Sequence, residues 1–103
     1  MNSSRIEALE RMLATRPSDH RARFGLALEL ERLERWEDVV HHLREYLSAT
    51  DDEGNAYGRL ARALLRLDRT EEAKEAYRQG IEAATRHGHP SLAMEIEEEM
   101  EEV

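Results

Sequence analysis

The sequence contains no cysteine, so disulfide bonds, thiolate metal sites and cysteine nucleophiles are excluded. No apolar run approaches the roughly 18 residues that a membrane-spanning helix needs. The segment 1–7 has no apolar stretch either, so we expect no signal peptide. With five glycines and two prolines in 103 residues, few positions interrupt regular structure. These absences lead us to expect a cytoplasmic protein.

Charge is plentiful but unevenly divided between the two signs. Charged residues make up 37% of the chain, and the formal net charge is -8 at pH 7. Because the phosphates of a nucleic acid repel such a surface, we expect no DNA or RNA partner. The basic side chains are almost all arginine, with Lys74 the only lysine. The length leaves room for a single domain, 1–103.

Apolar residues recur at intervals of three and four along most of the chain, which is the spacing of one helix face. No stretch alternates between apolar and polar residues as a half-buried strand does. The pattern therefore predicts an all-α protein with short loops and antiparallel neighbouring helices. Six helices are expected, at residues 4–16, 19–33, 36–49, 54–67, 70–87 and 90–102.

The apolar stripes repeat one another at a fixed distance. Leu9, Leu43 and Tyr77 are each 34 residues apart, and so are Leu26 and Leu60 in a second series. The third member of that second series follows after 32 residues, so the last loop is two residues short. A helix–turn–helix unit of 34 residues indicates a repeat protein in which each unit covers the apolar face of its neighbour. The leucines expected in its core are Leu43, Leu47, Leu60 and Leu64.

At this period the chain resembles the tetratricopeptide repeat family. The family's pattern is W-x-x-L-G-x-x-Y, then A-x-x-x-F, then a late proline. In the first unit Leu26-Ala27, Leu30, Val39 and Leu43 stand at these positions, and in the second Tyr57, Leu60-Ala61, Leu64, Ala73 and Tyr77.

The sequence also departs from this pattern. Arg23 replaces the leading aromatic residue of the first unit, and neither full unit ends in proline. These departures concern local packing and leave the period intact.

The resemblance implies a short right-handed superhelix of stacked helix pairs. Its parts are a half-repeat helix at 4–16, full repeats at 20–53 and 54–87, and a capping helix at 90–102.

The resemblance also implies a protein-protein interaction module, an adaptor that holds a peptide or protein segment in a concave groove. The family's groove positions fall on Arg21, Phe24, Leu28, Glu31 and Arg32, on Asn55, Gly58, Arg59, Arg62, Leu65 and Arg66, and on Met94, Glu97 and Glu98.

Two parts of this predicted groove allow two interpretations each. Phe24 and Leu28 are four residues apart and form either an exposed contact for a ligand or a patch that a flanking helix or a second copy covers. Arg59, Arg62 and Arg66 form a basic stripe at helical spacing. That stripe either receives an acidic peptide or is already neutralised by glutamates of the last helix, Glu97 and Glu98 among them.

The alternative function is self-association. If the helix 4–16 lacks the first helix of its unit, part of its apolar stripe has no cover and favours a homodimer. The residues expected at that interface are Ile6, Leu9, Met12 and Leu13.

The five histidines are the strongest metal-ligand candidates in the sequence. His41 and His42 point about 100° apart on a helix and do not share an ion comfortably. His87 and His89 flank Gly88 in a loop, and we interpret them as solvated surface residues. The sequence also has no glycine-rich phosphate loop and no serine nucleophile elbow. We therefore expect no metal, no cofactor and no enzyme activity.

Overall fold

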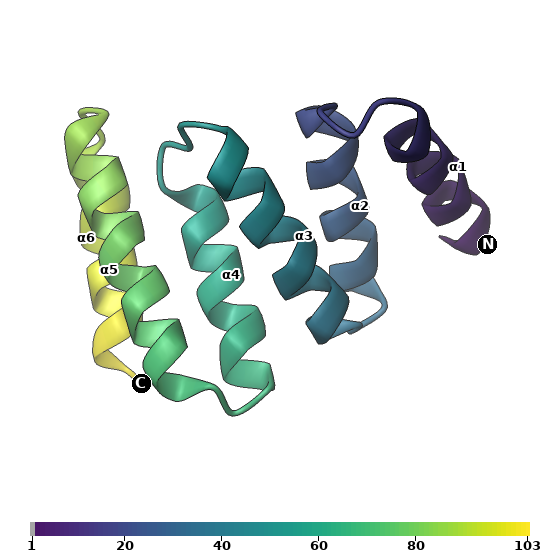
Figure 1. Cartoon of the computed structure of the whole chain (residues 1–103). Coiled ribbons are helices and arrows are strands. Elements are labelled where there is room, and N and C mark those ends of the chain that lie inside the picture. The colour runs from purple at the N-terminus through teal and green to yellow at the C-terminus, as the bar shows by residue number, and fades with distance from the viewer. Residues whose placement is uncertain (1) are drawn as a thin grey trace. The chain divides into compact units, whose positions relative to one another are not determined.

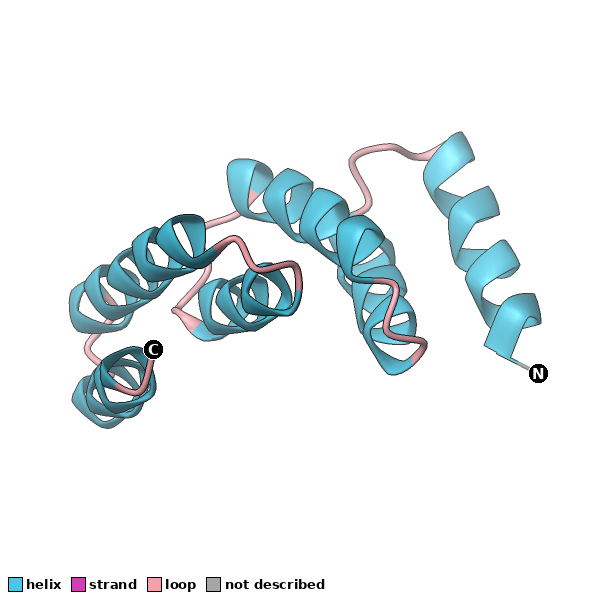
Figure 2. Ribbon diagram, turned by 90° about the horizontal axis from the view of Figure 1, so that it is seen from below, coloured by secondary structure: helices cyan, strands magenta, loops and turns pink. Residues whose placement is uncertain are grey.

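The structure, a computed structural model, describes residues 2–103 and contains six α-helices (Figure 1). All described residues lie in helices or loops, so the all-α prediction is confirmed (Figure 2). The helix ends differ from the predicted ones by two residues at most. The helices are α1 (Asn2–Thr15), α2 (His20–Arg32), α3 (Trp36–Ala49), α4 (Asn55–Arg66), α5 (Thr70–Arg86) and α6 (Pro90–Glu101).

Local side-chain chemistry sets several helix ends. The Asp19 carboxylate caps α2 by accepting a hydrogen bond of 3.0 Å from the backbone N–H of Ala22. Pro90 opens α6, where its missing N–H is not needed. After α2 and α4 the chain turns through Glu34 and Asp68, both at φ 58°. These two left-handed residues are 34 positions apart, so the turn repeats with the helices.

The helix contacts divide the chain into two compact units, one ending at Thr50 and the other beginning at Asp51. The first unit holds α1, α2 and α3, and the second holds α4, α5 and α6. Within each unit the middle helix packs on both of its neighbours. The single domain 1–103 and the right-handed superhelix stay predictions.

In the first unit α2 packs between α1 and α3. Leu26 and Leu30 of α2 are buried together with Val39 and Leu43 of α3. On the α1 side a Cβ added at Gly25 would lie 3.7 Å from Leu9 Cδ2, so the two helices touch there.

This unit also buries one carboxylate. Glu29 of α2 accepts hydrogen bonds from Arg5 Nε at 2.9 Å and from Arg32 Nη1 at 3.4 Å. The pairing matters because a buried carboxylate without a partner is strongly unfavourable.

In the second unit α5 packs between α4 and α6 through small residues. A Cβ added at Gly80 would lie 3.0 Å from Tyr57 Cβ, so α4 and α5 approach too closely for any other residue at this point. Gly54 precedes α4 at φ 130°, a conformation that favours glycine, and its own added Cβ would lie 3.1 Å from the Gly80 carbonyl oxygen. The buried small residues on α5 are Ala73, Ala76, Gly80, Ala83 and Ala84.

Candidate functional site

A narrow channel of about 70 Å³ runs between α4 and α6 in the second unit. Gly58 widens it because this position carries no side chain on the α4 wall. The channel is lined by Gly54, Asn55, Gly58 and Arg62 from the α4 side and by Leu92, Glu95, Ile96 and Glu99 from α6.

At one end the channel continues into a larger hollow of about 530 Å³, next to the turn between α5 and α6. The two spaces share Asn55, Leu92 and Glu95, so they form one continuous groove, called the α4–α6 groove below. Two of the predicted groove residues of α4, Asn55 and Arg62, line it, and so does Gly58.

The narrow end of the α4–α6 groove is closed by a three-residue network. Arg62 Nε donates to Glu99 Oε2 at 2.7 Å, and the Tyr77 hydroxyl donates to the same oxygen at 2.8 Å. Partial burial alone would raise the pKa of Glu99, but these two hydrogen bonds outweigh it and lower the pKa below its ordinary value of 4.5. Burial and the nearby carboxylate raise the pKa of Tyr77 well above 10.0, which keeps its hydroxyl protonated as a donor.

The partner of Arg62 is therefore Glu99, where the sequence led us to expect Glu97 and Glu98. Glu99 lies three residues after the buried Ile96 and shares its side of α6, whereas Glu97 and Glu98 are exposed. Of the other two predicted arginines, Arg59 is half-buried and Arg66 exposed, and neither is without a partner.

Carboxylates dominate the wide end of the groove. Glu53 Oε1 accepts a hydrogen bond of 3.4 Å from the Asn55 amide, and its Oε2 lies 3.5 Å from His89 Nε2. Glu95 faces the same space from α6. Along the whole groove three glutamates thus face one arginine.

The loop before α4 is fixed to the end of α5, which positions this wide end. Asp51 Oδ1 accepts a hydrogen bond of 3.0 Å from Arg86, and His87 Nε2 lies 3.1 Å away. The hydrogen bonds from His87 and Arg86 lower the pKa of Asp51. Asp52 Oδ2 then accepts from the backbone N–H groups of Gly54 and Ala56, which holds the first turn of α4.

The predicted groove residues of α2 lie in the first unit. Phe24 is half-buried, and its ring centroid lies 5.0 Å from that of Tyr46 on α3. A flanking helix therefore covers part of Phe24, as one of the two interpretations required. Leu28 is also half-buried, Arg21 is exposed, and Arg32 is bound to the buried Glu29.

The predicted self-association stripe needs a correction. Ile6 and Leu13 are only 5% and 8% exposed, because α1 packs this face on α2. Leu9 lies beside Gly25 at the same contact. Of the four residues only Met12 is exposed, at 48%.

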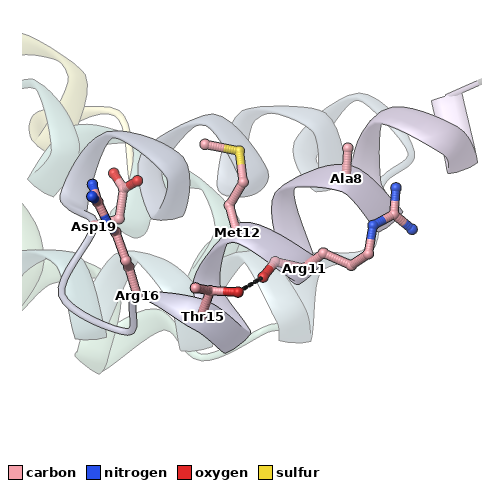
Figure 3. A pocket seen from close by; sticks show the side chains of 6 residues that line it. All are labelled: Ala8, Arg11, Met12, Thr15, Arg16 and Asp19. Atoms are coloured by element: carbon pink, nitrogen blue, oxygen red, sulfur yellow. Dashed lines mark hydrogen bonds between the residues drawn. The ribbon is translucent and has the colours of Figure 1, made fainter.

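The open face of α1 lies beside that stripe. Figure 3 shows Ala8 and Met12 pointing to the same side of the helix. They border a hollow of about 480 Å³, called the α1 hollow below. Its lining residues are Ala8, Arg11, Met12, Thr15, Arg16 and Asp19.

Sequence reasoning missed Glu53, Glu95 and Glu99 as groove residues. The signal for the last two was available, because Glu95 and Glu99 bracket the core residue Ile96 on α6 and are one helical turn apart. Glu53 had no such signal, since the fold of its loop depends on Asp51 and Asp52.

These features define the chain as a helical repeat protein. Residues 54–87, which span α4 and α5, match the model of the tetratricopeptide repeat family. The resemblance to this family, found from the 34-residue period, is therefore confirmed. No curated protein matches the chain.

Two further features of the described residues bear on the type of site. Within residues 2–103 no helix is long and apolar enough to cross a membrane. In the same range no group of three or more His, Asp or Glu side chains is arranged to hold a metal ion.

Proposed function

We propose that this chain is a protein-protein interaction module that binds a segment of a partner protein in the α4–α6 groove, and that it acts as an adaptor without catalysis. The observation that supports this most is that the groove lies along α4, the first helix of the matched repeat 54–87. Tetratricopeptide repeats generally mediate such contacts, and the groove combines an apolar wall at Leu92 and Ile96 with polar groups at both ends.

The charges of the groove suggest what the bound segment carries. Arg62 already shares its charge with Glu99, so an acidic ligand would have to displace an internal carboxylate. Glu53 and Glu95 at the wide end favour a cation instead. We therefore propose a partner segment with arginine or lysine side chains, in place of the acidic peptide considered from the sequence.

Selection of peptides from a random displayed library against the 103-residue chain tests this proposal. The enriched peptides should carry arginine or lysine, and their affinity should fall at least about tenfold in Glu95→Arg, because a charge-assisted hydrogen bond is replaced by repulsion. Glu82→Arg is the matched control, since Glu82 is exposed on α5 and does not line the groove. Equal binding by both variants, or enrichment of acidic peptides, would contradict the proposal.

The cytoplasmic location and the lack of a nucleic-acid partner stay predictions from composition. So does the homodimer, whose interface can no longer be the Ile6 and Leu13 stripe.

A further inference from the structure

The 34-residue period assigns each face of α1 a counterpart in the later helices. Ala8 and Met12 of α1 correspond to Ala76 and Gly80 of α5, two periods further on. On α5 both positions are buried, and Gly80 is the point of closest approach to Tyr57 of α4. This face of the second helix therefore packs on the first helix of the same repeat.

The first full repeat shows the same relation with different side chains. There the counterparts of Ala8 and Met12 are His42 and Tyr46 of α3. His42 Nδ1 lies 3.1 Å from Arg23 Nη1, and the Tyr46 ring packs against Phe24, both on α2. In both complete repeats, then, this face contacts the repeat's own first helix.

On α1 the same face lines the open α1 hollow instead of packing on a helix (Figure 3). Its counterpart positions predict what fits there, namely the first helix of a tetratricopeptide-like repeat. The surroundings of the hollow are basic on balance, with Arg11 and Arg16 facing one acid, Asp19.

The last helix has the complementary vacancy. By the same periods, Pro90 and Ala93 of α6 correspond to Phe24 and Ala27 of α2. Ala27 is buried and Phe24 packs on α3, whereas Ala93 is half-exposed and its neighbour Met94 is 61% exposed. This face of α6 borders a hollow of about 310 Å³, called the α6 hollow below. Its lining residues are Ile81, Thr85, Pro90, Ala93, Met94 and Glu97.

We propose that two copies of this chain join head to tail, with α6 of one copy in the α1 hollow of the next. The two helices would then form one complete repeat, with α6 as its first helix and α1 as its second. The apolar contacts would come from Met12 and Ala8 on one side and Ala93 and Met94 on the other.

A second copy fits these two surfaces better than an unrelated helix because their charges are complementary. Arg11 and Arg16 border the α1 hollow, while Glu97 borders the α6 hollow and α6 carries further exposed glutamates beside it. The two surfaces differ, so the contact is heterologous and leaves a free α1 at one end and a free α6 at the other. Such a contact does not stop at a dimer unless it closes into a ring.

The test is sedimentation velocity of the 103-residue chain over a wide range of concentration. The mean mass of the wild type should rise continuously with concentration and rise further at low salt, because charge pairs between exposed groups are screened by ions. Met12→Glu and Ala93→Glu should each weaken association at least about tenfold, because each places an acid in the apolar contact. Leu33→Glu is the matched control: Leu33 is 41% exposed but lies at the end of α2, outside both hollows.

Mixing the two variants distinguishes a head-to-tail contact from a symmetric one. The Met12→Glu copy keeps its α6 hollow and the Ala93→Glu copy keeps its α1 hollow, so the mixture should form a 1:1 complex and grow no further. Circular dichroism of each variant confirms that it is folded. A wild type that stays monomeric at every concentration and salt would overturn the proposal. A variant pair that forms no complex on mixing, or Ala93→Glu that associates like the wild type, would do so too.

Discussion

The two complete repeats, 20–53 and 54–87, solve the same packing problem with different residues. At the contact between their two helices, the first repeat places Arg23 and Tyr46 where the second places Tyr57 and Gly80. In the second repeat the aromatic side chain comes from the first helix and meets a glycine. In the first repeat it comes from the second helix, where Tyr46 packs on Phe24, while Arg23 turns to His42 and to the Pro17 carbonyl.

This difference explains why the loss of the leading aromatic residue does not break the period. The large side chain has moved across the contact, so similar volume fills the space between the helices. The exchange makes the first contact more polar and the second one tighter. It is also consistent with a family-model match over 54–87, where the pattern keeps its aromatic.

A second exchange follows the same division. Glu29 of the first repeat corresponds to Ala63 of the second, and both are buried. The first unit therefore stabilises a carboxylate through Arg5 and Arg32, whereas the second unit simply packs a methyl group. The first unit should accordingly depend more on the protonation of its side chains.

The largest effects are expected where the two repeats are alike. Leu30 and Leu64 are equivalent and almost fully buried, so Leu30→Ala and Leu64→Ala should each lower the free energy of unfolding by roughly 2–5 kcal/mol. Urea unfolding measures the loss, and amide exchange should accelerate first in the unit that carries the change. A loss below about 0.5 kcal/mol at either leucine would contradict their common place in the core.

A smaller effect of opposite sign is expected at two helical glycines of the second unit. Gly80→Ala should destabilise by about 1–2 kcal/mol, because its Cβ would meet Tyr57 Cβ at 3.0 Å and the crowding exceeds the gain in helix propensity. Gly58→Ala should stabilise by about 0.5–1 kcal/mol, since its Cβ meets only the flexible end of Arg62, at 3.4 Å. Thermal unfolding of both variants checks this, and equal signs would show that the close approach of α4 and α5 is wrong.

The smallest effects are expected from pH, and they should separate the two units. Burial first, and then the positive charges of His41 and Arg23, lower the pKa of His42 from 6.5, against a weaker opposite effect of Asp38 and Glu45. The folded first unit thus disfavours the charged imidazole. Its stability is complete above pH 6.5 and falls as the pH drops below that value and through the lowered pKa.

Glu99 gives the second unit a different range. Its folded pKa is lowered from 4.5, so its contribution is complete above pH 4.5 and is lost only as the pH falls through the lower folded value. Amide exchange between pH 7 and pH 4 should therefore show the first unit loosening before the second, once the intrinsic pH dependence of exchange is removed. His42→Gln should abolish the early loosening, and an unchanged profile in that variant would contradict the assignment.

The sequence predicted the fold well because the period depends on burial, which the apolar pattern records. Leu43, Leu60 and Leu64 are buried as expected, although Leu47 is only half-buried. The site was harder to predict, because it depends on which of several similar glutamates faces α4. Seven glutamates lie in or beside α6, and only the structure distinguishes Glu99 from its neighbours.

The error on α1 has a related cause. The sequence indicated correctly that a helix of this kind has two apolar sides, but it did not show which side α2 covers. Ile6 and Leu13 form the covered side, and Ala8 and Met12 form the open one.

The most direct test of the proposed binding site is an NMR titration of the 103-residue chain with a peptide selected from the displayed library. Gly58 lines the α4–α6 groove, and Gly25 lies in the first unit against Leu9, so their two glycine amide signals report on different places. Our account predicts that the Gly58 and Asn55 signals shift on binding while the Gly25 signal stays in place. A peptide that shifts Gly25 and leaves Gly58 unchanged would show that the ligand binds elsewhere.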